Sequence, residues 1–233
     1  MSARVLGVLS VALASLVIAT PAGGANECDG LLVCVSVAGP WVVVPTGSDT
    51  PRPQVAYQLS CPRRHVVAGL DARLSVRAID VGFLGALGSP VAPGITTSKS
   101  ALFIASYVGA SARAPTFKPF LGCIPAAGGG TRVPTSATAL GPGTPTTRRV
   151  KTVRVRPGAA VVVQRCRSGE RLVGGSHAFG FATRTPPSSS LVESLSAEQD
   201  IRGREVVVRV SADAELAGVR AVLQVHAVCA GAR

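Results

Sequence analysis

Two stretches of this 233-residue chain resemble each other: Cys61-Pro-Arg-Arg-His-Val-Val-Ala-Gly69 and Cys166-Arg-Ser-Gly-Glu-Arg-Leu-Val-Gly-Gly175. A second cysteine follows each stretch at nearly the same distance, Cys123 after 62 residues and Cys229 after 63. With one extra residue allowed in the second stretch, Val66-Val67-Ala68-Gly69 aligns with Leu172-Val173-Gly174-Gly175. The shared spacing predicts an internal repeat of about 106 residues.

The N-terminus is organised like a secretory signal. Arg4 precedes an uncharged run of fifteen residues, 5–19, and small residues occupy 22–25. A membrane-spanning helix needs roughly 20 apolar residues, so this run is short for a span. We expect residues 1–25 to be a signal peptide and the mature chain to have no transmembrane span. The protein would then be secreted or associated with the cell surface; the alternative is that the segment is retained as an anchor.

Export would place the six cysteines in an oxidising compartment, where disulfides form. The repeat predicts the pairs Cys61–Cys123 and Cys166–Cys229, which leaves Cys28–Cys34 as a short N-terminal loop. The competing interpretation is a zinc site. It is disfavoured because the sequence has no Cys-x-x-Cys pair and its three histidines lack ligand spacing. We expect neither a metal nor a cofactor.

Apolar residues recur mainly at every second position, which is the period of a β-strand. The clearest run is 218–229, where Arg220, Gln224 and His226 occupy the polar face, and we expect His226 to be solvated. Pro115 and Pro119 predict that the last strand of the first copy is an edge strand or irregular. Further valine-rich strands are predicted at 41–44, 55–59, 73–81, 101–108, 150–155, 159–164 and 206–210, and one helix at 191–199.

These patterns predict an all-β protein made of two tandem, disulfide-stapled β-sandwich-like modules. The first module is expected at 26–125 and the second at 148–233. The segment between them, 126–147, is rich in Gly, Pro and Thr and predicts a linker.

The formal net charge is +12, and its distribution is uneven. Eleven basic residues and no acidic residue lie between Asp80 and Glu170. The densest group consists of Arg148, Arg149, Lys151, Arg154 and Arg156. On a strand, Arg154 and Arg156 would point outward together, and guanidinium groups bind phosphate and carboxylate in bidentate fashion. The group therefore predicts a polyanion-binding surface; the alternative is a solvated edge strand that its charges protect from pairing.

No catalytic motif is present: the sequence has no Gly-x-Ser-x-Gly elbow, Ser-x-x-Lys, His-Glu-x-x-His, phosphate-binding loop or Gly-x-Gly-x-x-Gly. Ser176 and His177 are adjacent, and we interpret them as part of a turn after Gly174-Gly175. Aromatic residues make up only 4% of the chain and no nucleic-acid motif occurs, so specific nucleic-acid recognition is not expected. We do not expect an enzyme.

The cysteine-framed repeat, the signal segment and the Arg/Ala/Gly/Pro bias resemble secreted proteins of high-GC, actinomycete-type bacteria; the resemblance implies no activity. The function that we expect is non-catalytic binding to anionic envelope polymers or a lipid surface. One alternative is a secreted enzyme inhibitor that presents the loop 82–100, and another is a hydrolase of the envelope.

Overall fold

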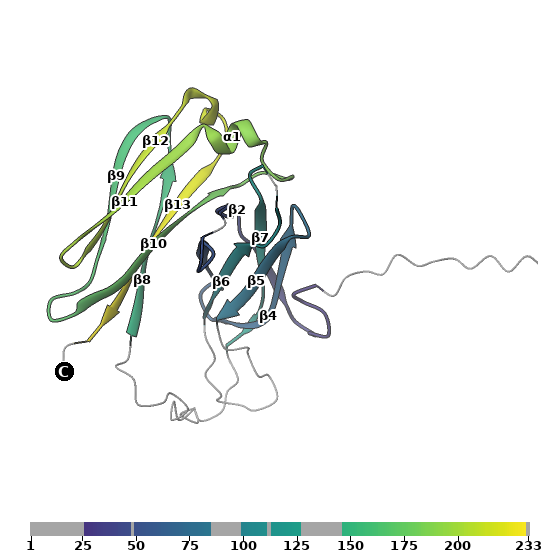
Figure 1. The fold of residues 1–233 in the computed structure, drawn as a ribbon. Helices are drawn as coiled ribbons and strands as arrows, with labels where there is room; N and C mark the ends of the chain where they lie inside the picture. The colour runs from purple at the N-terminus through teal and green to yellow at the C-terminus, as the bar shows by residue number, and fades with distance from the viewer. Residues whose placement is uncertain (1–25, 48, 85–98, 111–112, 127–145, 232–233) are drawn as a thin grey trace, which may run out of the picture.

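The structure, a computed structural model, describes residues 26–47, 49–84, 99–110, 113–126 and 146–231. Their regular secondary structure is nearly all β, as the period-two pattern predicted (Figure 1). The predicted signal peptide 1–25 lies outside them, as does all of the predicted linker except Ala126, Thr146 and Thr147. We call residues 26–126 the first half and residues 146–231 the second half.

The strands of the first half are short and bounded by turns: β1 (Val35–Ala38), β2 (Trp41–Val43), β3 (Gln54–Ser60), β4 (His65–Leu74), β5 (Ile79–Leu84), β6 (Ser100–Tyr107) and β7 (Thr116–Pro125). The second half contains β8 (Thr146–Val155), β9 (Gly158–Arg165), β10 (Arg171–Phe181), α1 (Ser189–Glu193), β11 (Leu195–Arg202), β12 (Glu205–Ala212), a 3-10 turn (Ala214–Leu216) and β13 (Ala221–Ala230).

The two halves pair their strands in the same order. In the second half β13 lies between β8 and β10, and β12 lies between β9 and β11. In the first half β7 lies between β4 and the successive strands β1 and β2, and β6 lies between β3 and β5. All pairings are antiparallel. Each half thus contributes one three-stranded sheet and part of a shared seven-stranded sheet.

A β-bulge occurs at the same place in both halves. In β4 the register shifts between Val67 and Gly69, and Val67 lies opposite Cys123. In β10 it shifts between Leu172 and Gly174, and Leu172 lies opposite Cys229. The structure therefore matches Val67, not Val66, with Leu172. The alignment drawn from sequence was wrong by one residue here, because the extra residue of the second half comes after the bulge.

Strand β2 connects the two halves into one sheet. It pairs with β7 through Val42 and Val43 and with β10 through Trp41 and Val42. Val42 is fully buried in the core of the first half, whereas Val43 packs against the core of the second. Consecutive side chains of a strand point to opposite faces. The two three-stranded sheets consequently cover opposite faces of the seven-stranded sheet.

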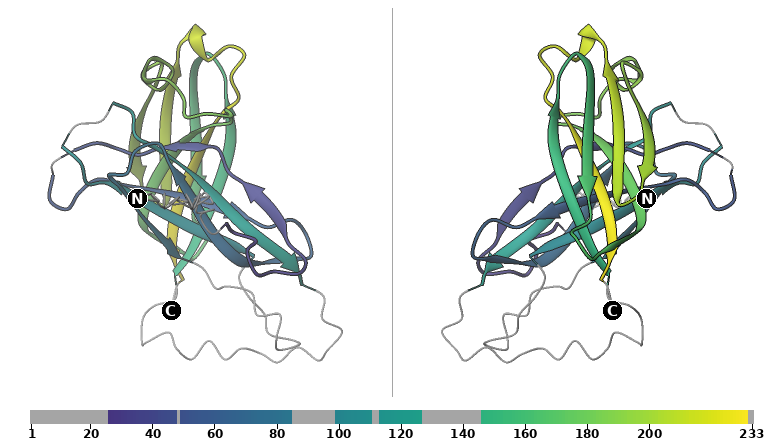
Figure 2. Two further views of the ribbon diagram at one scale, coloured as in Figure 1. Left: turned by 90° about the vertical axis from the view of Figure 1, so that its right-hand side faces the viewer. Right: turned by 90° about the vertical axis from the view of Figure 1, so that its left-hand side faces the viewer.

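A buried glutamine forms a second connection between the halves. Figure 2 shows the first-half strands crossing those of the second half at a steep angle. At the crossing, Gln224 of β13 is 3% exposed and hydrogen-bonds the backbone of Gln58 in β3. Its Oε1 accepts from the Gln58 N–H at 2.6 Å, and its Nε2 donates to the Gln58 carbonyl at 3.0 Å and to Thr152 Oγ1 at 3.2 Å. Gln224 thus satisfies backbone groups that β3 leaves free on the edge opposite β6.

All three predicted disulfides are present. Cys61–Cys123 and Cys166–Cys229 each link the two sheets of one half, and Cys28–Cys34 closes the N-terminal loop. In the chain-entropy model, closing loops of 62 and 63 residues stabilises each half by about 4 kcal/mol.

Three sequence predictions on single elements need correction. The predicted strand 73–81 is the end of β4, a turn and the start of β5. The predicted helix 191–199 is a helix only to Glu193, and β11 follows because residues from Leu195 onward pair with β12.

The last strand of the first half, β7, is a central strand and not the edge strand that its prolines suggested. Its Pro119 lies at the break between β1 and β2, where a missing N–H costs no ladder bond, and its carbonyl accepts from Gly39 at 2.8 Å.

The contact of Gln224 with β3 predicts a specific loss of stability. Gln224→Leu would leave the buried N–H and carbonyl of Gln58 without partners, and we expect the free energy of unfolding to fall by about 1–3 kcal/mol. Urea unfolding measures this change. Gln164→Leu on β9 is the matched control, and an equal loss in both variants would contradict the assigned role of Gln224.

Candidate functional site

The predicted basic group lies on β8, an edge strand that pairs only with β13 among the described residues. Its side chains alternate between the two faces of the sheet. Arg149 and Lys151 share a face with Val153 and Val155, which contact the core of the second half. Arg148 and Arg154 point to the other face, and Arg156 follows the end of the strand. The five residues do not form one row.

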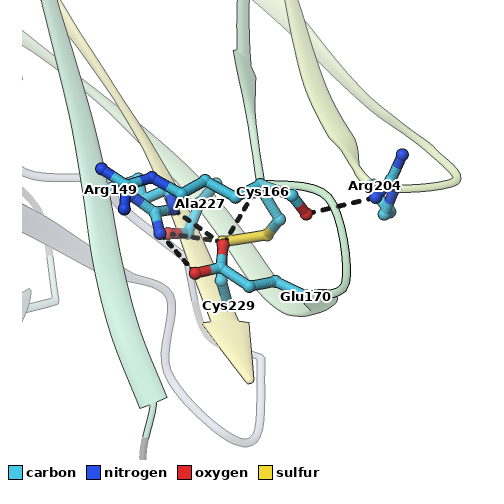
Figure 3. Close-up of polar contacts among 7 residues, drawn as sticks. Arg149, Cys166, Glu170, Arg204, Ala227 and Cys229 are labelled. Atoms are coloured by element: carbon cyan, nitrogen blue, oxygen red, sulfur yellow. Dashed lines mark hydrogen bonds and ion pairs between the residues drawn. A yellow bond between two sulfur atoms is a disulfide. The ribbon is translucent and has the colours of Figure 1, made fainter. Parts of the chain in front are cut away.

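Arg149 is occupied by an ion pair beside the Cys166–Cys229 disulfide (Figure 3). Its Nε donates to Glu170 Oε2 at 2.9 Å, and its Nη2 donates to Glu170 Oε1. The backbone N–H of Arg167 also donates to Glu170, at 2.7 Å. The hydrogen bond from Arg149, followed by that from Arg167, lowers the pKa of Glu170 to about 2. Arg149 is therefore neutralised and is not available to an external anion.

The sulfur atoms of Cys166 and Cys229 and a carboxylate oxygen of Glu170 lie within 4.8 Å of one another. The two sulfurs are bonded to each other, so neither can act as a thiolate ligand. Glu170 is held by Arg149. The donor set therefore does not fit a metal.

Lys151, Arg154 and Arg156 are exposed on β8 and just beyond it. The Lys151 ammonium donates to the carbonyl of Val163 at 3.3 Å. Among the described residues, none of the three cations forms an ion pair with a carboxylate. They are the members of the predicted group that the structure leaves accessible without a counter-charge.

Arg148 is half-buried and lies against a histidine. Its Nη1 is 3.4 Å from Nδ1 of His226. A guanidinium only donates hydrogen bonds, so Nδ1 is the acceptor and Nε2 carries the imidazole hydrogen. His226 is fully buried, and within the described part of the chain its Nε2 has no hydrogen-bond partner. Burial, followed by the positive charge of Arg148, lowers the pKa of His226 to about 4.

The predicted solvation of His226 is wrong. The alternation of 218–229 correctly separates its two faces, but the face opposite the core is covered by the first half of the chain. No local sequence signal could have shown this, because the covering strand, β3, lies more than 160 residues away. The buried, unpartnered nitrogen is the feature that sequence reasoning missed.

Ser176 and His177 lie in strand β10 and not in a turn. His177 pairs in register with Val225 and faces the core of the second half, where its Nδ1 lies 3.0 Å from Gln199 Oε1. Ser176 pairs with His226 and points to the opposite face. The two side chains therefore do not form a nucleophile–base pair.

The loop 82–100, which an enzyme inhibitor would present, lies mostly outside the described residues, since 85–98 are not described.

Two adjoining pockets lie between β3 and β10, with volumes of about 410 and 280 Å³. Both are lined by Gln54, Val55, Gly175 and Ser176. The larger pocket extends toward Val43, Pro45, Pro53 and Phe179, and the smaller one extends toward Arg148, Ile104 and Val228. We call the two together the inter-half cleft.

No protein-family model matches this chain, and neither a curated protein nor a solved structure matches it. Within the part of the chain that the structure describes, no helix is long and apolar enough to cross a membrane.

The buried His226 predicts a pH dependence of stability. Because the folded protein holds the imidazole neutral, the unfolded chain binds more protons between about pH 6.5 and 4. We expect the free energy of unfolding to fall by about 3 kcal/mol as the pH is lowered across this range. Protonation of Glu170 reduces stability further as the pH falls from about 4.5 towards 2.

Urea unfolding at a series of pH values measures this effect. His226→Gln should flatten the change between pH 6.5 and 4, whereas the control His65→Gln should retain it. A slope that persists unchanged in His226→Gln would show that another group is responsible.

Proposed function

We propose that the protein is an exported, non-catalytic binding protein that associates with anionic polymers or lipid surfaces of the cell envelope. The observation that carries the proposal is the placement of Lys151, Arg154 and Arg156 at an exposed sheet edge without acidic partners among the described residues. Arg148 and Arg149 take no part in this surface, because one is half-buried and the other is paired with Glu170.

The chemistry of these side chains suits a repeating anion. Two guanidinium groups two residues apart can each bind a phosphate or carboxylate in bidentate fashion. The flexible ammonium of Lys151 adds a point charge on the other face of the same strand. Attraction of this kind depends on accessible charge and weakens with salt. Export, which the N-terminal segment predicts and three disulfides support, would bring the surface to envelope polymers.

The proposal also treats the two halves as copies of one disulfide-stapled unit. Three features that the two halves share support this treatment. The strands pair in the same order, a β-bulge follows at the same distance after Cys61 and after Cys166, and a disulfide links the two sheets of each half. In this arrangement β8 is the equivalent of β1 and β2. The first half uses β2 to join the second half, whereas the second half presents β8 at the edge of the sheet.

Co-sedimentation with purified cell envelopes across a salt series tests the binding surface. We expect the oxidised mature protein to be retained at low salt and released as salt rises. Arg154→Glu/Arg156→Glu should abolish retention, because the reversed charges repel the same polymer. The variant Arg52→Glu/Arg77→Glu makes the same change in net charge on exposed residues of the first half and should retain binding.

The same variants distinguish polyanion binding by the β8 cations from the alternative role, in which these charges only protect the sheet edge from pairing. A charge of either sign blocks edge-to-edge pairing. If edge protection were the only role, both double variants would sediment like the wild type with envelopes and keep the oligomeric state of the wild type. That outcome, or the absence of retention of the wild type at low salt, would overturn the proposal.

A further inference from the structure

The absence of a side chain at Gly174 leaves space in the inter-half cleft. On one side the cleft is bounded by Gln54 and Val55 of β3, and on the other by Gly174, Gly175 and Ser176 of β10. A Cβ atom on Gly174 would come no closer than 3.7 Å to any neighbour, an ordinary contact with Val228. Packing therefore does not require glycine at 174; its missing side chain leaves room in the smaller pocket.

One end of the cleft is cationic. Arg148 lines the smaller pocket and has no carboxylate partner among the described residues. One of its N–H groups faces the neutral His226, and burial lowers the pKa of the guanidinium. A half-buried charge without a counter-charge is unfavourable, and a bound anion would remove that penalty with bidentate hydrogen bonds.

Uncharged polar side chains lie beside Arg148 in the smaller pocket. Ser176 and Gln54 line the same pocket. His226 lies opposite Ser176 in the strand register but lines neither pocket, so its buried Nε2–H is not available to a ligand in the cleft. The cationic end of the cleft is thus lined by Arg148 and by the neutral polar side chains of Ser176 and Gln54, and among the described residues by no acidic one.

The other end of the cleft is mainly apolar. The larger pocket continues past Val55 into the smaller one, and its walls combine the apolar side chains of Val43, Pro45, Pro53 and Phe179 with the polar side chains of His177 and Gln199. Pockets of a few hundred Å³ that combine apolar walls with a few polar groups are typical of small-molecule sites. A ligand that satisfies both ends has an anionic head beside Arg148 and an apolar chain along Val55.

We propose that the inter-half cleft is a binding site for a small amphipathic carboxylate, with the carboxylate held by Arg148 and the hydrocarbon chain between β3 and β10. The site is separate from the exposed cations Lys151, Arg154 and Arg156, which lie outside the cleft. The proposal does not depend on binding to the envelope.

Titration with octanoate, followed through backbone amide chemical shifts of the full mature protein, tests the site. An anion with about ten non-hydrogen atoms is expected to bind with a Kd of about 1–10 mM. The expected result is a saturable shift of the amides of Gly174, Gly175 and Ser176. 1-Octanol, which has the same chain without the charge, should shift these amides less than octanoate does at the same concentration.

Three variants locate the interaction. Arg148→Gln should weaken octanoate about tenfold and leave 1-octanol unchanged, because it removes the charge and keeps the walls. Gly174→Leu should abolish binding of both probes by filling the smaller pocket. Arg154→Gln, on the same face of β8 but outside the cleft, should bind like the wild type. Unchanged melting temperatures of the variants show that each one is folded.

Two outcomes would overturn the proposal. One is the absence of saturable shifts at Gly174–Ser176 in the wild type at about 50 mM octanoate, several times the expected Kd. The other is equal weakening by Arg148→Gln and Arg154→Gln, which would assign octanoate to the general basic surface. If Gly174→Leu does not fold, the difference between Arg148→Gln and Arg154→Gln decides the question alone.

Discussion

The architecture depends on the three residues of β2, which belong to both halves at once. Val42 is buried in the first core, and Val43 contacts the second. Trp41 pairs with Phe181 of β10, which extends the sheet from one half to the other. Because neighbouring residues of a strand necessarily face opposite sides, this one strand places the two small sheets on opposite faces of the large one. The steep crossing of the halves follows from that placement (Figure 2).

The crossing then determines the surroundings of both functional candidates. It brings β3 across β10 and β13, where Gln224 satisfies the backbone of Gln58 and the inter-half cleft remains beside it. It also divides the basic residues of β8 between two environments. Arg148 is drawn against His226 in the contact between the halves, while Arg154 remains in solvent. Basic residues that are close in the sequence thereby differ in their burial and in their neighbours.

The sequence predicts what depends on local pattern and misses what depends on contacts between the halves. The all-β class follows from the alternation of apolar residues, and the disulfides follow from the spacing of Cys61, Cys123, Cys166 and Cys229. Alternation shows that one face of β13 is apolar. It does not show that the polar face, with Gln224 and His226, is buried as well. The pairing of Arg149 with Glu170 depends on a loop that returns past the disulfide, which charge counting along the chain could not reveal.

The sharing of β2 has a consequence for the order in which the chain can fold. During synthesis β2 is made early, but its partner β10 begins about 130 residues later, and the strands that complete the second core follow still later. Until then Val43 and the outer edge of β3 have nothing to cover them. Contacts between such distant segments slow folding, because long loops must close before the contact is formed. The first half therefore remains incomplete until its own C-terminal counterpart, ending at β13, has emerged.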